Sequence, residues 1–127
     1  MSFETISVIG LGYIGLPTAA MFASRRKQVI GVDVNQETVD IINRGEIHIV
    51  EPELDIIVHA AVTEGYLKAT TVPEAADAFL IAVPTPFKDN ERGAPEPDLK
   101  FIEAACKSIA PVLKKGDLVI LESTSPV

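Results

Sequence analysis

Residues 5–15 read TISVIGLGYIG, a short apolar run that leads directly into a glycine-rich turn. The run is rich in β-branched side chains and predicts a buried strand that ends at Gly10. The small apolar stretch at residues 16–24 predicts a helix directly after the turn. Gly10, Gly12 and Gly15 therefore form a G-x-G-x-x-G pattern between a strand and a helix, which is the context typical of dinucleotide-binding folds.

Each glycine of this pattern has its own expected role. Gly10 permits the tight turn, Gly12 lacks a Cβ and lets a pyrophosphate approach the backbone, and Gly15 lets the helix pack closely on the strand. The N-terminus of the helix offers N–H groups and a partial positive charge to the phosphates.

An acid follows at the expected distance. Residues 28–33 (QVIGVD) predict a second strand, and its last residue, Asp33, lies 18 residues beyond Gly15. An acid about 20 residues after the turn accepts hydrogen bonds from the adenosine ribose and disfavours a 2′-phosphate. No Arg or Lys follows Asp33 before Arg44, so we expect NAD rather than NADP. The alternative is that the glycines form a purely structural turn and that Asp33 caps the next helix.

The rest of the chain alternates apolar strands with helical patterns. This alternation predicts an α/β fold in one domain over residues 1–127, a Rossmann-type doubly wound parallel sheet in a three-layer α/β/α arrangement with about five to six strands. A polar stretch (KDNERGAPEP) predicts an exposed, mobile loop at 88–97. Further strands are expected at 67–71, 78–83 and 117–121, helices at 36–43, 52–64 and 98–113, and a short helical turn at 73–76.

Composition excludes several classes of protein. The 127 residues carry a formal net charge of −7, which argues against a nucleic-acid or anionic-membrane partner. No apolar run approaches the roughly 20 residues of a membrane span. The single cysteine, Cys106, excludes an internal disulfide and a cysteine-cluster metal site, and we expect a reduced, cytoplasmic compartment.

Two further segments are expected at the carboxyl edge of the predicted sheet, where ligands of such folds bind. Val83 and Thr85 leave one strand in the sequence VPTP, and residues 122–124 (Glu122, Ser123, Thr124) leave the last one. Both segments would border the nicotinamide half of a dinucleotide. Ordinary turn chemistry is the alternative, because Pro, Ser and Thr favour turns.

Several stretches resemble the N-terminal NAD-binding domain of the UDP-glucose/GDP-mannose dehydrogenase family. The glycine pattern is shared with many dehydrogenases, whereas the combination of GEIHIVEP, AVPTPF and ESTSPV is much more specific. The matching stretches are 6–17 (ISVIGLGYIGLP), 28–34 (QVIGVDV), 42–53 (INRGEIHIVEPE), 81–87 (IAVPTPF) and 108–127 (SIAPVLKKGDLVILESTSPV).

The resemblance implies an enzyme that oxidises the C6 hydroxyl of a UDP-amino sugar to a carboxylate, in two successive reductions of NAD, with a thiohemiacetal and a thioester on a cysteine. It implies that Asp33 holds the adenosine ribose and that Thr124 orients a catalytic water. The pyrophosphate would be held by Gly10, Gly12, Tyr13, Ile14 and Gly15, and the nicotinamide would be bordered by Val83, Thr85, Glu122 and Thr124.

In that family the catalytic cysteine and lysine, and the sugar-nucleotide domain, lie downstream of the ESTSPV-like motif. We therefore expect this chain to be the N-terminal part of a longer dehydrogenase, homo-oligomeric at full length, and to bind NAD without turnover by itself. Cys106 is expected on the buried face of a helix and not as the nucleophile. His48 and His59 have no partners at metal-ligand spacing, so no metal is expected. The alternatives are a stand-alone NAD-binding or redox-sensing module and a related enzyme acting on UDP-glucose or a β-hydroxyacid.

Overall fold

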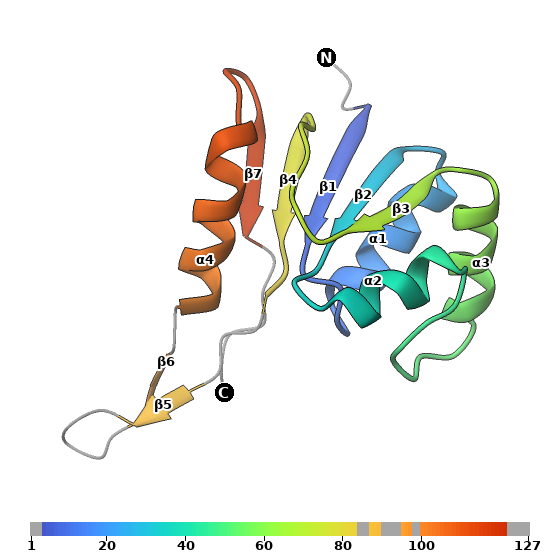
Figure 1. Ribbon diagram of the computed structural model, residues 1–127, viewed down its shortest axis with the longest axis horizontal. Helices are drawn as coiled ribbons and strands as arrows, with labels where there is room; N and C mark the ends of the chain where they lie inside the picture. The colour runs from blue at the N-terminus through green and yellow to red at the C-terminus, as the bar shows by residue number, and fades with distance from the viewer. Residues whose placement is uncertain (1–3, 84–86, 90–94, 98–99, 122–127) are drawn as a thin grey trace.

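A five-stranded parallel sheet forms the centre of the molecule, in the order β3-β2-β1-β4-β7 (Figure 1). The computed structural model describes residues 4–83, 87–89, 95–97 and 100–121. The chain runs outward from β1 to β3 and then returns to the other side of β1, so the strand order reverses between β1 and β4. This order confirms the predicted doubly wound sheet. The strands are β1 (Thr5–Ile9), β2 (Gln28–Val32), β3 (Leu67–Thr70), β4 (Ala78–Ile81) and β7 (Leu118–Leu121).

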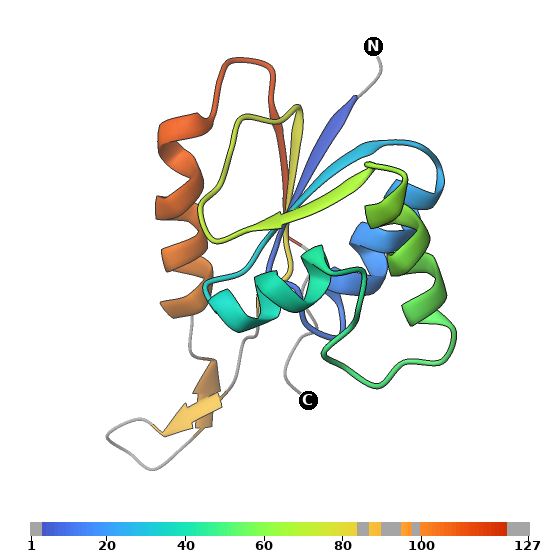
Figure 2. The same ribbon diagram turned by 45° about the vertical axis from the view of Figure 1, so that its right-hand side comes forward.

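Helices cover both faces of the sheet, which confirms the three predicted layers (Figure 2). On one face, the core joins the first three helices to side chains of β1–β4, including Val8 and Val29. On the other face, Ala105 and Ile109 of the fourth helix pack against Phe79 and its neighbours. The helices are α1 (Gly15–Ser24), α2 (Gln36–Asn43), α3 (Leu54–Thr63) and α4 (Lys100–Ile109), and a 3-10 turn η1 (Ala110–Val112) follows.

Local chemistry sets the ends of α2 and α3. Asn35 caps α2, because its Oδ1 accepts hydrogen bonds from the N–H groups of Glu37 at 2.9 Å and Thr38 at 3.3 Å. Gly45 and Gly65 follow the two helices with φ of +81° and +83°, a conformation that glycine adopts without strain. Both glycines stand where the sequence predicts helix ends.

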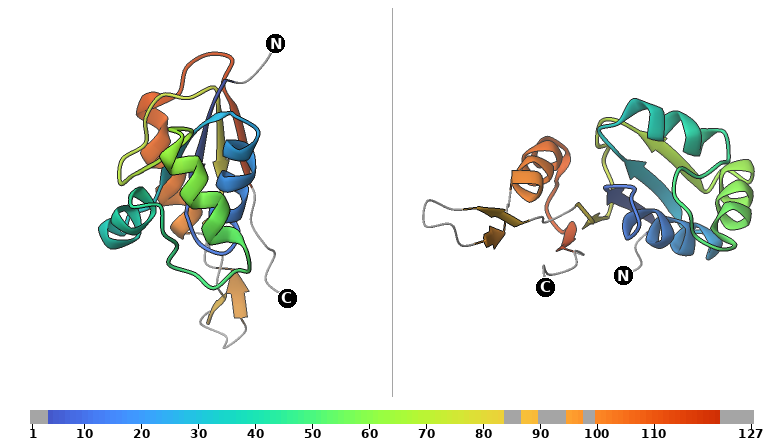
Figure 3. Two further views of the ribbon diagram at one scale, coloured as in Figure 1. Left: turned by 90° about the vertical axis from the view of Figure 1, so that its right-hand side faces the viewer. Right: turned by 90° about the horizontal axis from the view of Figure 1, so that it is seen from below.

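Part of the segment predicted as an exposed, mobile loop at 88–97 forms a small antiparallel pair of strands, β5 (Phe87–Asp89) and β6 (Pro95–Pro97), which the sequence analysis did not predict. The pair lies apart from the main sheet (Figure 3). Polar composition predicts exposure, but it does not predict backbone pairing between two short segments. The two prolines of β6 occupy alternate positions, where their missing N–H groups fall on the same side of the strand.

Two smaller predictions were also wrong. Residues 73–76 form no helical turn but an irregular connection between β3 and β4. Cys106 is exposed rather than buried, because the buried seam of α4 consists of Ala105 and Ile109, one turn apart. The periodicity of the sequence indicates the buried face of a helix, but it does not fix how wide the contact with the sheet is.

Candidate functional site

The glycine turn leaves β1 at the carboxyl edge of the sheet, beside the point where the strand order reverses (Figure 1). Backbone hydrogen bonds tie its first residue to the neighbouring strand, since the Gly10 N–H donates to the Val32 carbonyl at 2.7 Å. On the other side, the Ala82 N–H donates to the Ile9 carbonyl at 2.7 Å. In open α/β sheets, ligands bind at this kind of reversal.

The three glycines of the turn differ in whether the surrounding protein leaves room for a side chain. A Cβ on Gly10, whose φ is +98°, would lie 2.6 Å from the Ala82 carbonyl oxygen, and a Cβ on Gly15 would overlap the carbonyl oxygen of Gly10. Gly12 is different, because a Cβ there would meet no atom within 4 Å. The fold itself therefore requires Gly10 and Gly15, whereas the space in front of Gly12 is open to a ligand.

The start of α1 offers hydrogen-bond donors to that open space. Its N-cap residue, Ile14, makes no side-chain capping bond. Within the described chain, no hydrogen bond engages the N–H groups of residues 12–15, and Tyr13 is 62% exposed. An uncapped helix N-terminus with unpaired N–H groups is a ready site for an anion such as a pyrophosphate.

Asp33 lies next to the turn, directly after β2, and is half-buried. Its Oδ2 accepts the Leu11 N–H at 3.0 Å and its Oδ1 accepts the Asn35 N–H at 2.9 Å. An ionised carboxylate has about four acceptor positions, so two remain for a ligand, the number needed by the two hydroxyls of a ribose. The cap of α2 is Asn35, so Asp33 is not the capping residue. Sequence reasoning missed the contact with Leu11, because spacing along the chain does not show which acceptors the fold already uses.

A pocket of about 300 Å³ opens beside Asp33. Its walls are mostly apolar and come from the carboxyl ends of the strands and from α4. Such a pocket suits a flat aromatic group such as a nucleotide base. The sequence prediction placed Asp33, Gly10 and Val83 at the site, but it missed the α4 side of the pocket, since no local motif marks it. The lining residues are Ile9, Gly10, Val32, Asp33, Val34, Thr71, Pro73, Val83, Phe101, Ala104, Ala105 and Ser108.

Other candidate residues lie elsewhere. Thr85, Glu122 and Thr124 fall outside the described residues, so their roles stay predictions. His59 is exposed on α3, and His48 is half-buried with an Nδ1 that has no hydrogen-bond partner. In the described part of the chain, no cluster of three or more His, Cys, Asp or Glu side chains could hold a metal ion. Among the same residues, no helix has the length and apolar character to cross a membrane.

Similarity to known proteins agrees with this geometry. The chain is 76% identical over all 127 residues to a UDP-N-acetyl-D-mannosamine dehydrogenase of Yersinia pestis. It is 69% identical over the same length to an NDP-N-acetyl-D-galactosaminuronic acid dehydrogenase of Ralstonia nicotianae. In both cases it spans 29% of the relative's length. A solved UDP-N-acetyl-mannosamine dehydrogenase of Staphylococcus aureus matches 94% of this chain with 29% of its own, at 47% identity and a TM-score of 0.88.

The family assignment rests on nearly the whole chain. Residues 4–127 match the model of the NAD-binding domain of the UDP-glucose/GDP-mannose dehydrogenase family. The doubly wound sheet, the glycine turn and the acid after β2 are the features expected of such a domain. The chain therefore belongs to the UDP-glucose/GDP-mannose dehydrogenase family, as an NAD-binding domain of that family.

Proposed function

We propose that this chain is the cofactor-binding part of an enzyme that oxidises the C6 hydroxyl of a UDP-N-acetyl-hexosamine to a carboxylate. The observation that carries the proposal is the open space in front of Gly12, set between an uncapped helix start and the Asp33 carboxylate. Bound NAD supplies the hydride acceptor for such an oxidation. The residues of this chain bind and orient that acceptor.

The pyrophosphate would lie against Gly12 and accept hydrogen bonds from the N–H groups of Tyr13, Ile14 and Gly15. The two remaining acceptor positions of Asp33 would take the adenosine ribose hydroxyls, and the adjoining pocket would hold the adenine. A 2′-phosphate would bring like charge against Asp33, so NADP is disfavoured. Gly10 supports the turn from behind and forms part of the pocket wall.

The nicotinamide half of the site is proposed from the sequence. Val83, half-buried at the end of β4, leads into the segment that carries Thr85. Glu122 and Thr124 follow β7, whose pairing with β4 brings the two carboxyl ends together. Parallel neighbours end at the same edge of a sheet, so both segments would approach one ligand. In this arrangement Thr124 would orient a water for the second oxidation.

A specific observation supports a second candidate sugar. The relative from Yersinia pestis is named for N-acetyl-mannosamine, and the relative from Ralstonia nicotianae, at 69% identity, is named for N-acetyl-galactosaminuronic acid. We propose UDP-N-acetyl-mannosamine as the substrate of the whole protein and the galacto-configured sugar as the second candidate. Comparing kcat/KM for the two sugars with the full-length protein decides between them.

The wider setting is also a proposal. We infer a homo-oligomeric whole protein in the cytoplasm, where NAD is available and an unpaired, exposed Cys106 stays reduced. The excess of acidic side chains, with a net charge of −7, disfavours nucleic acid and anionic membranes as partners.

Calorimetric titration of this chain with NAD and with NADP tests the cofactor site. The sharpest variant is Gly12→Ala, whose added Cβ touches no protein atom but occupies the pyrophosphate space. We expect NAD to bind, NADP to bind at least tenfold more weakly, and Gly12→Ala to weaken NAD at least tenfold with an unchanged melting midpoint. Unchanged NAD affinity in Gly12→Ala, or equal affinity for both dinucleotides, would overturn the proposed site.

A further inference from the structure

Leu11, the residue between the first two glycines of the turn, sends its side chain back over β2. Leu11 is fully buried, and the strand position beneath it is Gly31. A Cβ on Gly31 would lie 2.9 Å from Leu11 Cδ2 and 3.0 Å from Leu11 Cδ1. Gly31 has no positive φ that would explain a glycine there. The close approach of Leu11 is therefore the reason for glycine in the middle of this strand.

Leu11 has little freedom to move away from such a Cβ. Its exposed fraction is 0%, and it belongs to the same hydrophobic core as Val8 and Leu16, which joins the first three helices to one face of the sheet. Protein interiors are close-packed, so a methyl group added at Gly31 must displace either the Leu11 side chain or its backbone. Because Leu11 lies between Gly10 and Gly12, a shift of its backbone moves the glycine turn.

The backbone of Leu11 is also the link between the turn and the acid. Its N–H donates to Asp33 Oδ2 at 3.0 Å, and Asp33 is the residue directly after β2, two residues beyond Gly31. One residue of the turn thus makes two contacts with this segment, through its side chain with Gly31 on β2 and through its N–H with Asp33 directly after β2. The first contact is steric and the second is polar.

We propose that Leu11 and Gly31 form a steric lock that positions the glycine turn and the Asp33 carboxylate for the dinucleotide. The proposal rests on the proposed cofactor site and adds two positioning residues to it. Neither residue needs to contact the ligand. When Leu11 packs on Gly31, its N–H occupies one acceptor position of Asp33. The remaining acceptor positions of Asp33 then keep a fixed orientation toward the ribose.

A compensating pair of substitutions tests the lock. Gly31→Ala adds a methyl group under Leu11, and Leu11→Val removes the colliding Cδ atoms, so the double variant conserves the number of carbon atoms. The three variants and the unaltered chain are compared by NAD titration, by melting midpoint and by amide hydrogen exchange of Leu11. The Val29 amide, which donates to the Tyr66 carbonyl at 2.8 Å at the far end of β2, serves as the internal reference.

We expect Gly31→Ala to weaken NAD binding about tenfold. This is the effect of losing one hydrogen bond to a charged group, here a bond from the ribose to a misaligned Asp33 carboxylate. The midpoint should fall, and the Leu11 amide should exchange about tenfold faster relative to the Val29 amide, which reports the change in global stability. Adding Leu11→Val should restore all three. A merely structural glycine would change the midpoint without changing the Leu11 amide relative to Val29.

Two results would overturn the lock. One is a Gly31→Ala variant that melts higher, as alanine does at an open strand position, and keeps the Leu11 amide protected. The other is a double variant that is no better than Gly31→Ala alone. If the unaltered chain failed to bind NAD, the proposed function would fall, whereas the amide exchange and the midpoints would still decide the lock.

Discussion

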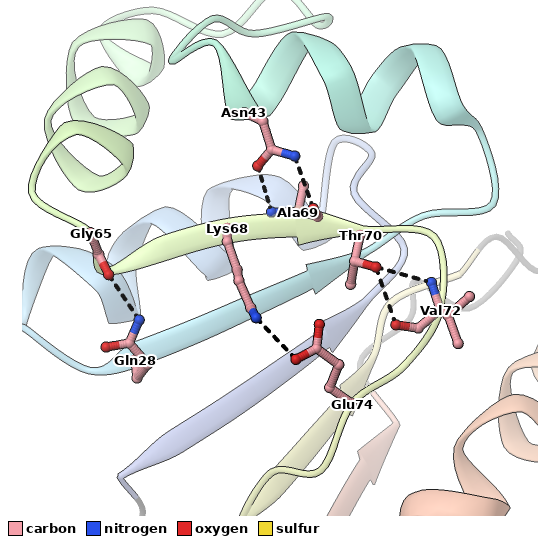
Figure 4. Close-up of polar contacts among 8 residues, drawn as sticks. All are labelled: Gln28, Asn43, Gly65, Lys68, Ala69, Thr70, Val72 and Glu74. Atoms are coloured by element: carbon pink, nitrogen blue, oxygen red, sulfur yellow. Dashed lines mark hydrogen bonds and ion pairs between the residues drawn. The ribbon is translucent and has the colours of Figure 1, made fainter.

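The two edges of the parallel sheet, β3 and β7, are held in different ways. Both strands have four residues and begin with leucine, but Leu67 of β3 is 3% exposed and Leu118 of β7 is 41% exposed. On β3, a side chain also hydrogen-bonds the backbone groups at the outer edge of the strand. Asn43, the last residue of α2, donates from Nδ2 to the Ala69 carbonyl at 2.9 Å and accepts the Ala69 N–H at 2.8 Å (Figure 4).

The β7 edge depends on backbone pairing and on charged groups at its start. Lys114 Nζ donates to the Ala76 carbonyl and to Asp117 Oδ1, both at 2.8 Å, and lies 3.8 Å from Asp77 Oδ1. Asp77 in turn accepts the N–H groups of Glu4 and Thr5 at 3.0 Å, which ties β4 to the start of β1. We call Asp77, Lys114 and Asp117 the amino-end cluster.

The difference separates two sources of stability within one sheet. Apolar burial and a paired amide hold β3, so its stability should depend on side-chain volume. A polar cluster holds the start of β7, so its stability should depend on pH and charge. The proposed cofactor site lies at the carboxyl ends of the strands, opposite the amino-end cluster. Its proposed residues Gly10 and Asp33 directly follow β1 and β2, which lie nearer to β3 than to β7.

Matched leucine truncations should show the largest effect. Leu67→Ala removes a buried side chain and leaves a cavity, so we expect the free energy of unfolding to fall by roughly 2–5 kcal/mol. Leu118→Ala, the same change on β7, should lower it by less than about 1 kcal/mol, because much of that side chain is already in water. Urea unfolding of both variants measures the difference, and equal losses would show that the two edges are held alike.

The paired amide on β3 should contribute less than Leu67 but still a measurable amount. Asn43→Ala leaves both backbone groups of Ala69 without their partner, so we expect a loss of about 1–3 kcal/mol in the free energy of unfolding. Gln28→Ala is the control, since Gln28 makes a single exposed hydrogen bond to the Gly65 carbonyl at 2.8 Å (Figure 4). It should cost less than about 0.5 kcal/mol. A similar loss of unfolding free energy in the two variants would show that Asn43 stabilises β3 no more than an exposed hydrogen bond does.

These contacts mark where prediction from sequence succeeds and where it stops. Periodicity and glycine spacing predict β1, the turn, α1 and Asp33, because all the required residues lie within one continuous segment. The contacts of Asn43 with Ala69 and of Lys114 with Ala76 join residues that are far apart in sequence. No local pattern carries them.

The candidate site shows the same limit. The positions of Gly10, Gly12 and Gly15 are predicted from spacing, but only three-dimensional contacts separate the two glycines that the fold requires from the one that faces open space. In the sequence, Gly31 is an ordinary residue of an apolar strand. Only the three-dimensional contact with Leu11 shows why a glycine stands there. The exposure of Cys106 likewise depends on how far α4 sits over the sheet, which is a property of packing and not of periodicity.

Acid should weaken the β7 side before the β3 side. Hydrogen bonds from the Thr5 and Glu4 N–H groups, with the charge of Lys114, hold the pKa of Asp77 below its ordinary value. The side-chain hydrogen bond from Lys114 lowers the pKa of Asp117 in the same way. A folded-state pKa below the unfolded one stabilises the fold above the ordinary value of about 4, and this contribution is lost as the pH falls from that value through the lower, folded-state pKa.

The acid effect is measured as amide exchange in β7 and β3 between about pH 5 and about pH 3, after correction for intrinsic rates. We expect protection to fall first in β7. In an Asp77→Asn variant, the dependence of β7 protection on pH should be flatter, because one of the two titrating carboxyls is gone. Loss of protection in both strands at the same pH would argue that the amino-end cluster does not act on β7 in particular.

The smallest effect should come from the exposed ion pair on β3, where Lys68 Nζ lies 2.9 Å from Glu74 Oε1 (Figure 4). Glu74→Gln should change the free energy of unfolding by less than about 0.5 kcal/mol, and even that should vanish in high salt. Lys114→Met removes the donor that joins Ala76 to Asp117, so it should be the more harmful of the two and should keep part of its effect in salt. Urea unfolding at low and high ionic strength compares them. If Glu74→Gln lowered the free energy of unfolding as much as Lys114→Met, charged groups would contribute equally at β3 and β7. The two edge strands would then differ only in apolar burial.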